Sequence, residues 1–469
     1  EHWISVPGVG GSSPPGGTKK GKNMSKKISK SQLSSFKKEF DLSKHCKNTM
    51  NTLTRSKLED ATMDWDTYRK LDHNYSNIVK NEMSKVTNQK ASGRCWGFAA
   101  LNLMRIDFAK KYNLSDFEFS QSHFMFFDKL EKSNYFLENI LSTLDEDFDS
   151  RIVMWLLDSP IQDGGQWDMF VNLMEKYGVV PQSAMPESLH SSSSRSMNVI
   201  ITRTLRKFAS ILRDDYRDGV SLEELRKIKV EMMSTIFKLL CEFIGKPPEK
   251  FDWQTRDKKK KFISHKNITP IDFYKQMVPF NLNDKVCLIH CPMSNKKFNK
   301  LYTVSYLGNV VEGQIIKYLN VPIDEMKKAS IKSIKNNEAV WFGCDVGKMF
   351  HRDLGVMHNK LYDYELFFGI NPDMDKATRL EYGDSQMTHA MLFTGVDIKN
   401  NKSTKWRVEN SWGNKSGDKG YFLMSDEWFD EYNYEVVVDK KYLTKDILKL
   451  FKQKPISLNP WDPMGALAK

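Results

Sequence analysis

The segment NQKASGRCWGFAALNLMR, residues 88–105, contains one cysteine directly ahead of a long apolar run. Residues 95–112 are apolar on nearly every helical face, and this pattern predicts a buried helix. The short turn 92–94 precedes that helix, so Cys95 is expected at the helix N-terminus and Arg94 is expected to be exposed. Unpaired backbone N–H groups and the helix dipole favour a thiolate at such a position. Cys95 is therefore either a nucleophile or an inert core thiol.

The chain is large enough to bury an extensive core. It has 469 residues and a mass of 54.6 kDa, and 40% of its residues are hydrophobic. This length suits one large core or two to three domains. No apolar run reaches the roughly 18 to 20 residues that a membrane span needs. Residues 1–23 lack the apolar centre of a secretory signal, so we expect a disordered leader or an added extension, with Met24 as the natural start.

The cysteines predict neither a disulfide framework nor a metal site. Six cysteines in 469 residues are too few for a disulfide-stabilised fold, and they indicate reduced thiols in a cytoplasmic protein. Cys287 and Cys291 lie on either side of His290 and resemble half of a zinc site. No second ligand pair follows at a suitable spacing, so we expect no metal and no other cofactor.

The chain is basic, with a formal net charge of +12 and a pI of about 9.1. Lysine-rich runs contribute to this charge, most clearly RDKKKKF at 256–262. Such runs usually form solvated surface. The alternative is a basic face that binds DNA or RNA without sequence preference, because no zinc-finger, RNP or heptad pattern is present.

The order of helical and strand patterns divides the chain into a helical part and a β part. A Gly-Gly turn, an amphipathic helix and a Gly-Pro stop occupy residues 163–181. Strand patterns dominate later, at 339–346, 389–398, 404–412 and 420–429. The predicted parts are a leader at 1–23, a helical segment at 24–80, a helical lobe at 81–189, a helical insertion at 190–325, a β lobe at 326–455 and a C-terminal arm at 456–469. We therefore expect an α+β fold with two lobes and a cleft between them.

A nucleophilic cysteine needs a base, and the base needs a third group that orients its ring. The strand segments 389–398 and 404–412 predict a hairpin with its loop at 399–403. In that register His389 faces residue 413, close enough for the Asn410 amide to reach the imidazole. Each residue alone has an ordinary structural interpretation, but together with Cys95 they predict a catalytic centre.

The motifs QKASGRCW, THAMLFTG and ENSWG resemble those of the papain-like cysteine proteases. The resemblance extends to the Gly-Gly segment and covers nearly all of residues 85–435 in the family's order. It implies the following roles in chain order: Gln89 in the oxyanion hole, Cys95 as nucleophile, His389 as base, Asn410 as orienting group, and Trp412 as the indole that shields the contact of His389 with Asn410 and takes part in substrate binding.

Two departures from the secreted papain-like enzymes narrow the resemblance. The secreted enzymes carry C-G-[SA]-C-[WY] at this site, whereas Ser92 replaces the first cysteine here. His389 follows Cys95 by 294 residues (389 − 95), against roughly 130 to 150 in the secreted enzymes. The excess matches the predicted insertion at 190–325. With the ending WDPMGALAK, these features resemble the bleomycin hydrolase branch, which includes the bacterial aminopeptidases C.

This branch resemblance implies a cytoplasmic cysteine aminopeptidase without cofactor, assembled as a homohexamer around an internal channel. It implies peptide substrates, together with the amide of bleomycin and homocysteine thiolactone. The C-terminal arm is expected in the substrate cleft, where Ala468 and Lys469 contact the substrate and self-cleavage after Ala468 removes Lys469. Two alternatives stay open: an endopeptidase on the same scaffold, and a basic nucleic-acid-binding protein that keeps the scaffold for structure.

Overall fold

The computed structural model describes residues 26–80, 83 and 85–468, and the chain divides into two compact units. The first unit comprises the chain up to Thr62 together with Tyr364–Ile370, and the second comprises Met63–Asp363 and Asn371–Lys469. The predicted leader at 1–23 and the predicted start at Met24 lie outside the described residues. Among the described residues, no helix is both long and apolar enough to cross a bilayer.

The first unit is helical, as the polar pattern of its sequence predicts. Its helices are α1 (Lys30–Leu42), α2 (Lys44–Leu53), α3 (Leu58–Thr62) and α14 (Tyr364–Phe368). Ser29 starts α1 with a capping box shared with Gln32, which satisfies two backbone donors at the helix end. Helix α14 packs on α2, where Thr49 Oγ1 donates a 3.0 Å hydrogen bond to the carbonyl of Phe367. None of the residues of α1 is buried.

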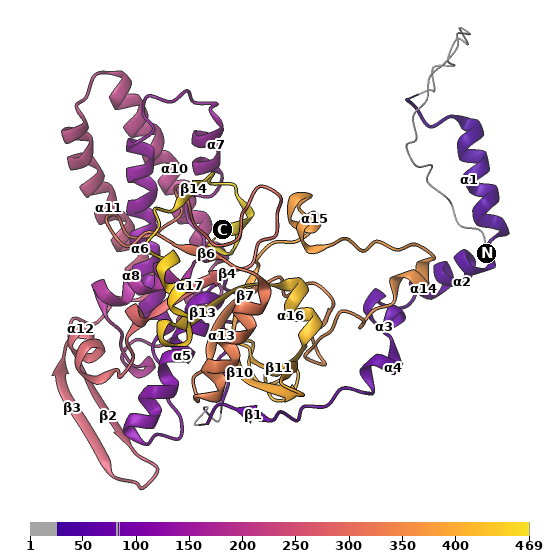
Figure 1. Cartoon of the computed structure of the whole chain (residues 1–469). Helices are drawn as coiled ribbons and strands as arrows, with labels where there is room; N and C mark the ends of the chain where they lie inside the picture. The colour runs from indigo at the N-terminus through magenta and orange to yellow at the C-terminus, as the bar shows by residue number, and fades with distance from the viewer. Residues whose placement is uncertain (1–25, 81–82, 84, 469) are drawn as a thin grey trace. The chain divides into compact units, whose positions relative to one another are not determined.

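Helices dominate the first half of the second unit. They are α4 (Trp65–Tyr68), α5 (Cys95–Tyr112), α6 (Gln121–Leu141), α7 (Arg151–Asp158), α8 (Trp167–Tyr177), α9 (Leu189–Ser192), α10 (Arg195–Arg217), α11 (Leu222–Ile244) and α12 (Pro270–Asp272). The long helices α10 and α11 lie side by side and both pack against α6 (Figure 1). These two helices lie in the region 190–325, and through α6 they are connected to α5, the helix that begins at Cys95.

Strands dominate the second half of this unit. The strands are β1 (Asn77–Ile78), β2 (Phe251–Arg256), β3 (Phe262–Ile268), β4 (Lys285–Ile289), β5 (Lys300–Val304), β6 (Tyr318–Asn320), β7 (Val340–Cys344), β8 (Phe350–His351), β9 (Val356–Met357), β10 (His389–Lys399), β11 (Lys402–Glu409), β12 (Tyr421–Ser425), β13 (Asn433–Asp439) and β14 (Ile456–Leu458). The remaining helices are α13 (Ile323–Lys335), α15 (Lys376–Glu381), α16 (Asp426–Tyr432) and α17 (Lys445–Leu450). The predicted α+β class is confirmed.

One large sheet forms the β part, and β2 and β3 form a separate hairpin (Figure 1). The order in the large sheet is β14-β5-β6-β4-β13-β7-β10-β11-β12-β9-β8, and β1 also pairs with β10. Strands β4, β5 and β6 come from the region 190–325 yet belong to this sheet. The strand expected at 420–429 is wrong in its second half. Strand β12 ends at Ser425, whose side chain caps α16, so residues 426–429 are helical.

Helix α5 packs against β7 and β10, and this contact joins the helical half to the sheet. Trp96 and Trp341 are fully buried at this contact, and the ring centroid of the buried Trp167 lies 6.2 Å from that of Trp341. The indole N–H of Trp341 donates a 3.1 Å hydrogen bond to the carbonyl of Trp96, so the indole links β7 directly to the first turn of α5. The N-terminus of α5 and the start of β10 are thereby held at one place in the core.

Candidate active site

Cys95 is the first residue of α5 and is 4% exposed. Arg94 occupies the N-cap position without a side-chain capping bond, so the first N–H groups of the helix are not satisfied by a cap. The apolar helix that follows is buried along most of its length, as its sequence pattern predicts. Cys95 therefore lies where the helix dipole stabilises negative charge on sulfur.

The hairpin of β10 and β11 brings His389 to Asn410. The expected register holds in the middle of the hairpin, where Val396 pairs with Trp406. A bulge between Phe393 and Gly395 shifts it by one residue on the side of His389, and a second bulge, between Asp397 and Ile398, shifts it by one residue on the side of the loop. His389 Nε2 lies 2.8 Å from Asn410 Oδ1, which also accepts a 2.8 Å hydrogen bond from the backbone N–H of Ser411. Because the amide oxygen is an acceptor, Nε2 carries the proton and Nδ1 is left as the basic nitrogen.

The indole of Trp412 covers this contact. Its ring centroid lies 4.9 Å from that of His389, at an interplanar angle of 38°. The guanidinium of Arg352 lies 4.6 Å from the Trp412 centroid on the same indole. The His389–Asn410 hydrogen bond is therefore shielded from water, and a shielded polar contact is stronger than an exposed one.

Cys95 and His389 are neighbours across the helix–sheet contact. The backbone N–H of Ala390, the residue after His389, hydrogen-bonds to the Cys95 thiol. Burial raises the pKa of Cys95 to about 11, and burial lowers the pKa of His389 to about 4. Both shifts favour the uncharged forms, because either charge alone is poorly solvated there. Proton transfer from thiol to imidazole creates two opposite charges side by side, and each then stabilises the other.

Gln89 is fixed in the turn ahead of Cys95. Its side-chain nitrogen donates a 2.8 Å hydrogen bond to the Ser92 carbonyl, and its side-chain oxygen accepts a 2.9 Å hydrogen bond from Ser411 Oγ. Its backbone N–H donates to the Ser411 carbonyl at 2.9 Å. Gln89 is thereby tied to the residue next to Asn410, so one network orients the amide donor beside the cysteine and the group that holds the histidine.

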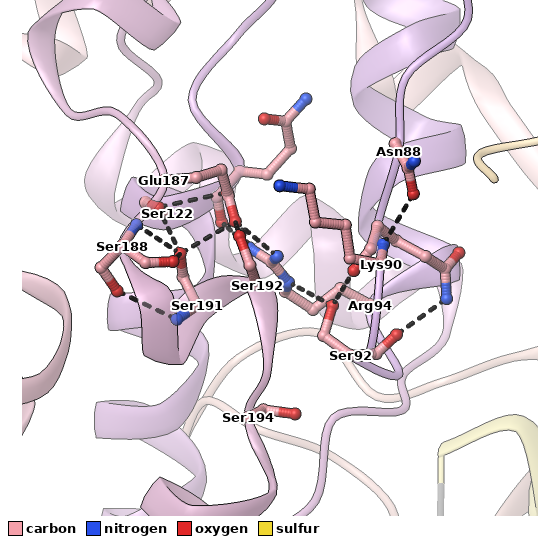
Figure 2. A network of polar contacts seen from close by, with 12 residues as sticks. Asn88, Lys90, Ser92, Arg94, Ser122, Glu187, Ser188, Ser191, Ser192 and Ser194 are labelled. Carbon is pink, nitrogen blue, oxygen red and sulfur yellow. Dashed lines mark hydrogen bonds and ion pairs between the residues drawn. The ribbon is translucent and has the colours of Figure 1, made fainter. Parts of the chain in front are cut away.

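Arg94 is buried, and the expectation that it is exposed is wrong. Arg94 is 1% exposed, and its guanidinium nitrogens Nη1 and Nη2 donate hydrogen bonds of 3.0 and 2.8 Å to the two carboxylate oxygens of Glu187. Its Nε donates a 2.9 Å hydrogen bond to Ser92 Oγ, and Ser92 Oγ donates a 2.8 Å hydrogen bond to the Gln89 carbonyl. Figure 2 shows Arg94 between Ser92 on one side and Glu187 on the other. Arg94 therefore braces the turn that carries Gln89 and Cys95.

Hydroxyl groups complete the environment of Glu187. Ser122 Oγ and Ser191 Oγ donate to its carboxylate at 3.2 and 2.8 Å, as Figure 2 shows. Burial by itself would raise the pKa of Glu187, but the hydrogen bonds and charge of Arg94, with those of the serines, hold that pKa below its ordinary value. The sequence gives no signal for this partner, since Arg94 and Glu187 are 93 residues apart.

The C-terminal arm lies against the Gly-Gly segment. The backbone N–H of Gly165 donates a 3.1 Å hydrogen bond to the carbonyl of Leu467, and the Leu467 side chain is buried. A Cβ on Gly165 would lie 2.4 Å from the Trp96 ring, so only glycine fits there. The arm ends in a 3₁₀ helix, η5 (Pro463–Ala468), which includes the backbone of Ala468. Lys469 lies outside the described residues.

Two contacts fasten the arm further upstream. Lys296 Nζ lies 2.8 Å from Asp462 Oδ2 in a pair whose side chains are 1% and 13% exposed. The guanidinium of Arg151 lies 3.7 Å from the ring centroid of Trp461. The sequence did not indicate Lys296 or Arg151 as part of the site, because both are distant in the chain from Asp462 and Trp461, the residues that they contact.

The cysteine pair noted in the sequence does not form a metal site in the part of the chain that the structure describes. There, no three His, Cys, Asp or Glu side chains are grouped as metal ligands. Cys287 Sγ instead donates a 2.7 Å hydrogen bond to Glu435 Oε1, and both groups are buried. All six cysteines are free thiols.

The assembled groups suit nucleophilic acyl transfer. A thiol at a helix N-terminus, an imidazole with its basic nitrogen free, an orienting amide and a fixed amide donor are the parts this chemistry needs. The structure brings four predicted residues to this place, namely Gln89, Cys95, His389 and Asn410, with Trp412 above the ring. Of the predicted C-terminal arm, it places Leu467 beside the Gly-Gly segment, and the backbone of Ala468 is the last residue of η5.

Comparison with known proteins points to one family. The model of the peptidase C1-like family matches residues 27–465. Bleomycin hydrolase of Mus musculus is 48% identical over 427 residues, which cover 89% of this chain and 94% of that protein. Aminopeptidase C of Listeria innocua is 46% identical over 445 residues, which cover 95% and 100%. The crystal structure of PepW from Lactobacillus rhamnosis HN001 matches with a TM-score of 0.92 and 43% identity, covering 94% of this chain and 99% of that one.

Proposed function

This chain belongs to the peptidase C1-like family, with a papain-like fold, and is a cysteine aminopeptidase, and on this basis we propose that Cys95 is its nucleophile. We assign His389 as the base, Asn410 as the group that orients it and Gln89 as an oxyanion donor. The observation that carries the assignment is the meeting of the α5 N-terminus with the start of β10, where the Ala390 N–H contacts the Cys95 thiol.

In the acylation step, the Cys95 thiol gives its proton to Nδ1 of His389. The sulfur attacks the carbonyl carbon of the substrate's N-terminal residue, and His389 passes the proton to the leaving amine. The shortened peptide departs and a thioester remains on Cys95. Water then gives a proton to His389 and attacks the thioester, which releases the amino acid, and His389 returns the proton to the thiolate. Asn410 holds the ring throughout.

The oxyanion formed in both steps needs hydrogen-bond donors. The Gln89 side-chain amide has two N–H groups, of which one is bonded to Ser92 and the other is available to the substrate. The backbone N–H of Cys95 supplies a second donor at the helix N-terminus. One such donor is worth about 3 kcal/mol of transition-state stabilisation. Fixing Gln89 from both ends, through Ser92 and Ser411, keeps this donor in place before the substrate binds.

The C-terminal arm supports exopeptidase action rather than endopeptidase action. Its Leu467 carbonyl accepts from Gly165 as the backbone of a bound peptide would, so the arm occupies the part of the cleft for residues ahead of the scissile bond. A peptide with residues there would collide with it, whereas a free α-amino group could pair with the arm's terminal carboxylate. The next peptide bond, after Ala468, would then lie at the nucleophile and be cut, which removes Lys469.

Three measurements test these assignments. Cys95→Ala should abolish hydrolysis of an aminoacyl coumarin amide, whereas Cys46→Ala should leave it unchanged. Mass spectrometry should find Lys469 missing from the active enzyme and present in the Cys95→Ala variant. Deleting residues 462–469 should admit N-acetylated peptides. Turnover by the Cys95→Ala variant would overturn the nucleophile, and continued rejection of blocked peptides by the truncated enzyme would overturn the arm as the gate.

We also propose that the chain assembles into a homohexamer. The support is helix α1, which exposes apolar side chains at helical spacing without burying any: Leu33, Phe36 and Phe40. Another copy of the chain would cover this face. Phe36→Glu should lower the mass measured by light scattering, and an unchanged hexamer in that variant, or a monomeric wild type, would count against the proposal.

Cytoplasmic location and two further substrates belong to the same proposal. Six free thiols, four of them buried, suit a reducing compartment. Homocysteine thiolactone is a small thioester with a free α-amino group, and bleomycin carries an amide that the same acyl transfer would hydrolyse. Each should be consumed by the wild type and untouched by Cys95→Ala, measured by loss of the starting compound.

A second candidate function, non-specific nucleic-acid binding, is favoured by the β2–β3 hairpin. Its tip carries four consecutive lysines, residues 258–261, and all four are exposed, with the hairpin standing apart from the large sheet (Figure 1). Binding through these lysines should show a slope of log K against log salt of roughly −3 to −4. Sequence-specific or salt-independent binding in gel-shift assays would rule this function out.

A further inference from the structure

A pocket of about 810 Å³ opens beside the turn that carries the nucleophile. Ala91 and Gly93 form one wall, and Gly93 is two residues from Cys95. Asp163 forms another wall, and it is two residues from Gly165, where the C-terminal arm is bound. The pocket is therefore lined on one side by the turn that leads into Cys95 and on another by the segment that leads into Gly165.

One face of α10 forms the outer wall. The lining residues of this helix and its cap recur at intervals of three and four, which places them on a single helical face. They are Ser194, Arg195, Asn198, Val199, Thr202, Arg203 and Arg206. Helix α10 is part of the block at 190–325 that the spacing between Cys95 and His389 predicted, so this wall is supplied by the inserted segment.

The only carboxylate in the lining is already matched by a buried cation. Asp163 lies 2.5 Å from Lys129 Nζ, and it accepts hydrogen bonds from Ser194 Oγ, Asn198 Nδ2 and the Gly93 N–H at 2.5, 2.8 and 2.8 Å. Although burial alone would raise the pKa of Asp163, Lys129 and these donors hold it far below its ordinary value. The carboxylate is thus saturated and presents no net charge to a ligand.

The arginines of the α10 face are not matched in this way. Arg195 and Arg203 are exposed, and neither forms an ion pair with any residue that the structure describes. Arg206 is fixed by hydrogen bonds of 2.8 and 2.9 Å to the carbonyls of Leu157 and Asp158 at the end of α7, which leave its charge uncompensated. The pocket is consequently positive.

We propose that this pocket receives the side chain of the substrate's N-terminal residue and selects for a carboxylate, as in peptides that begin with glutamate or aspartate. This proposal rests on the proposed function, because it requires the acyl group to sit on Cys95. From that acyl carbon, the α-amino group points toward the arm, and the side chain points past Gly93 into the pocket. A glutamate carboxylate then meets the arginines of α10, above all Arg203, in the middle of the face.

The pocket is larger than one side chain, so uncharged residues are accepted as well and the charge decides the preference. Surface-exposed arginines act partly through water, which limits the gain to a modest factor. We expect kcat/KM for a glutamyl substrate to exceed that for the glutaminyl substrate by about fivefold to tenfold at low salt. The ratio should shrink toward one as salt is raised, because salt screens exposed charges.

Glutamyl and glutaminyl coumarin amides differ only in this charge, and they give a direct test with the full-length enzyme. Arg203→Gln should lower kcat/KM for the glutamyl substrate about fivefold and leave the glutaminyl value within twofold, and Arg195→Gln should act in the same direction. Arg217→Gln, on the same helix but outside the pocket, is the matched control and should change neither. The glutaminyl activity also reports whether each variant is folded.

The outcomes separate this inference from the proposed function. A wild type that cleaves neither substrate would overturn the proposed function. A wild type that cleaves both with a ratio of one or below, or an Arg203→Gln variant that loses both activities equally, would overturn carboxylate selection alone. A ratio above one that falls in Arg203→Gln and with salt, but not in Arg217→Gln, supports the inference.

Discussion

Replacing Lys296 by methionine should loosen the C-terminal arm without touching the catalytic groups. Lys296 is buried, and its ammonium pairs with Asp462 at 2.8 Å, five residues before the Leu467 carbonyl that binds Gly165. Methionine retains the apolar stem and removes the charge. Asp462 is then left partly buried without its cation, and the arm loses the contact that holds its final segment in position.

The size of the effect follows from the burial of the pair. Removing one partner of a buried ion pair costs 3–5 kcal/mol, and the 13% exposure of Asp462 places this case at the low end, about 3 kcal/mol. Since 1.4 kcal/mol is a factor of ten, the equilibrium between open and closed arm shifts about 100-fold. While the closed state still dominates, hydrolysis of a blocked peptide is proportional to the open fraction. It should therefore rise about 100-fold, and hydrolysis of free-amine peptides should change little.

The assay compares kcat/KM for an N-acetylated peptide with that for the same peptide with a free amine. Lys297→Met is the matched control, because Lys297 is the exposed neighbour of Lys296 and should leave the ratio at the wild-type value. Asp462→Asn should reproduce the phenotype of Lys296→Met, and the double variant should add little more. A blocked-to-free ratio in Lys296→Met within twofold of wild type would refute the idea that this pair holds the gate.

Three further predictions concern single groups. Glu187→Gln leaves the buried Arg94 guanidinium without its counter-charge and should lower the free energy of unfolding by about 3 kcal/mol in urea titrations, whereas Glu249→Gln, at an exposed pair, should be neutral. Burial raises the pKa of Glu435 to about 8, so the folded carboxyl stays protonated while the unfolded one ionises above 4.5. Wild-type stability should therefore fall as pH rises through that window, by about 3 kcal/mol at pH 7, and Glu435→Gln should abolish the slope. The pKa of His389, about 4, predicts that kcat/KM falls only below that pH. Asn410→Ala should move this limb to lower pH with residual activity, because the Asn410 hydrogen bond raises the pKa of His389. An acidic limb of the kcat/KM profile at the ordinary pKa of an imidazole would contradict this prediction.

Local patterns were sufficient to predict the parts of the site that are close in sequence or set by regular structure. The apolar run after Cys95 predicts a buried helix whatever packs on it, and the alternation around residues 389–412 predicts a hairpin. The register could be predicted only to within a residue, because a bulge on either side of the Val396–Trp406 pair shifts the pairing by one residue. A bulge depends on packing against neighbouring strands, which the hairpin's own sequence does not contain.

Arg94 could not be placed from the sequence for a different reason. An arginine beside a turn is ordinarily solvated, since burying a guanidinium without a partner is costly. Its burial depends on a carboxylate 93 residues away that is itself surrounded by hydroxyl groups, and no local pattern reports such a partner. The same holds for Lys296, whose partner Asp462 comes from the far end of the chain.

The Arg94–Glu187 pair also connects the nucleophile's turn to the start of helices α9 and α10. Ser92 occupies the position where secreted papain-like enzymes have a cysteine, so no disulfide can form at this position. Arg94 braces the turn with hydrogen bonds instead, and its partner Glu187 stands directly ahead of α9 and α10. The carboxylate that fixes the turn of Cys95 therefore also fixes the start of the segment whose arginines line the pocket. Because both walls share this anchor, a change at Glu187 should alter the preference for the substrate's first residue as well as the stability of the fold.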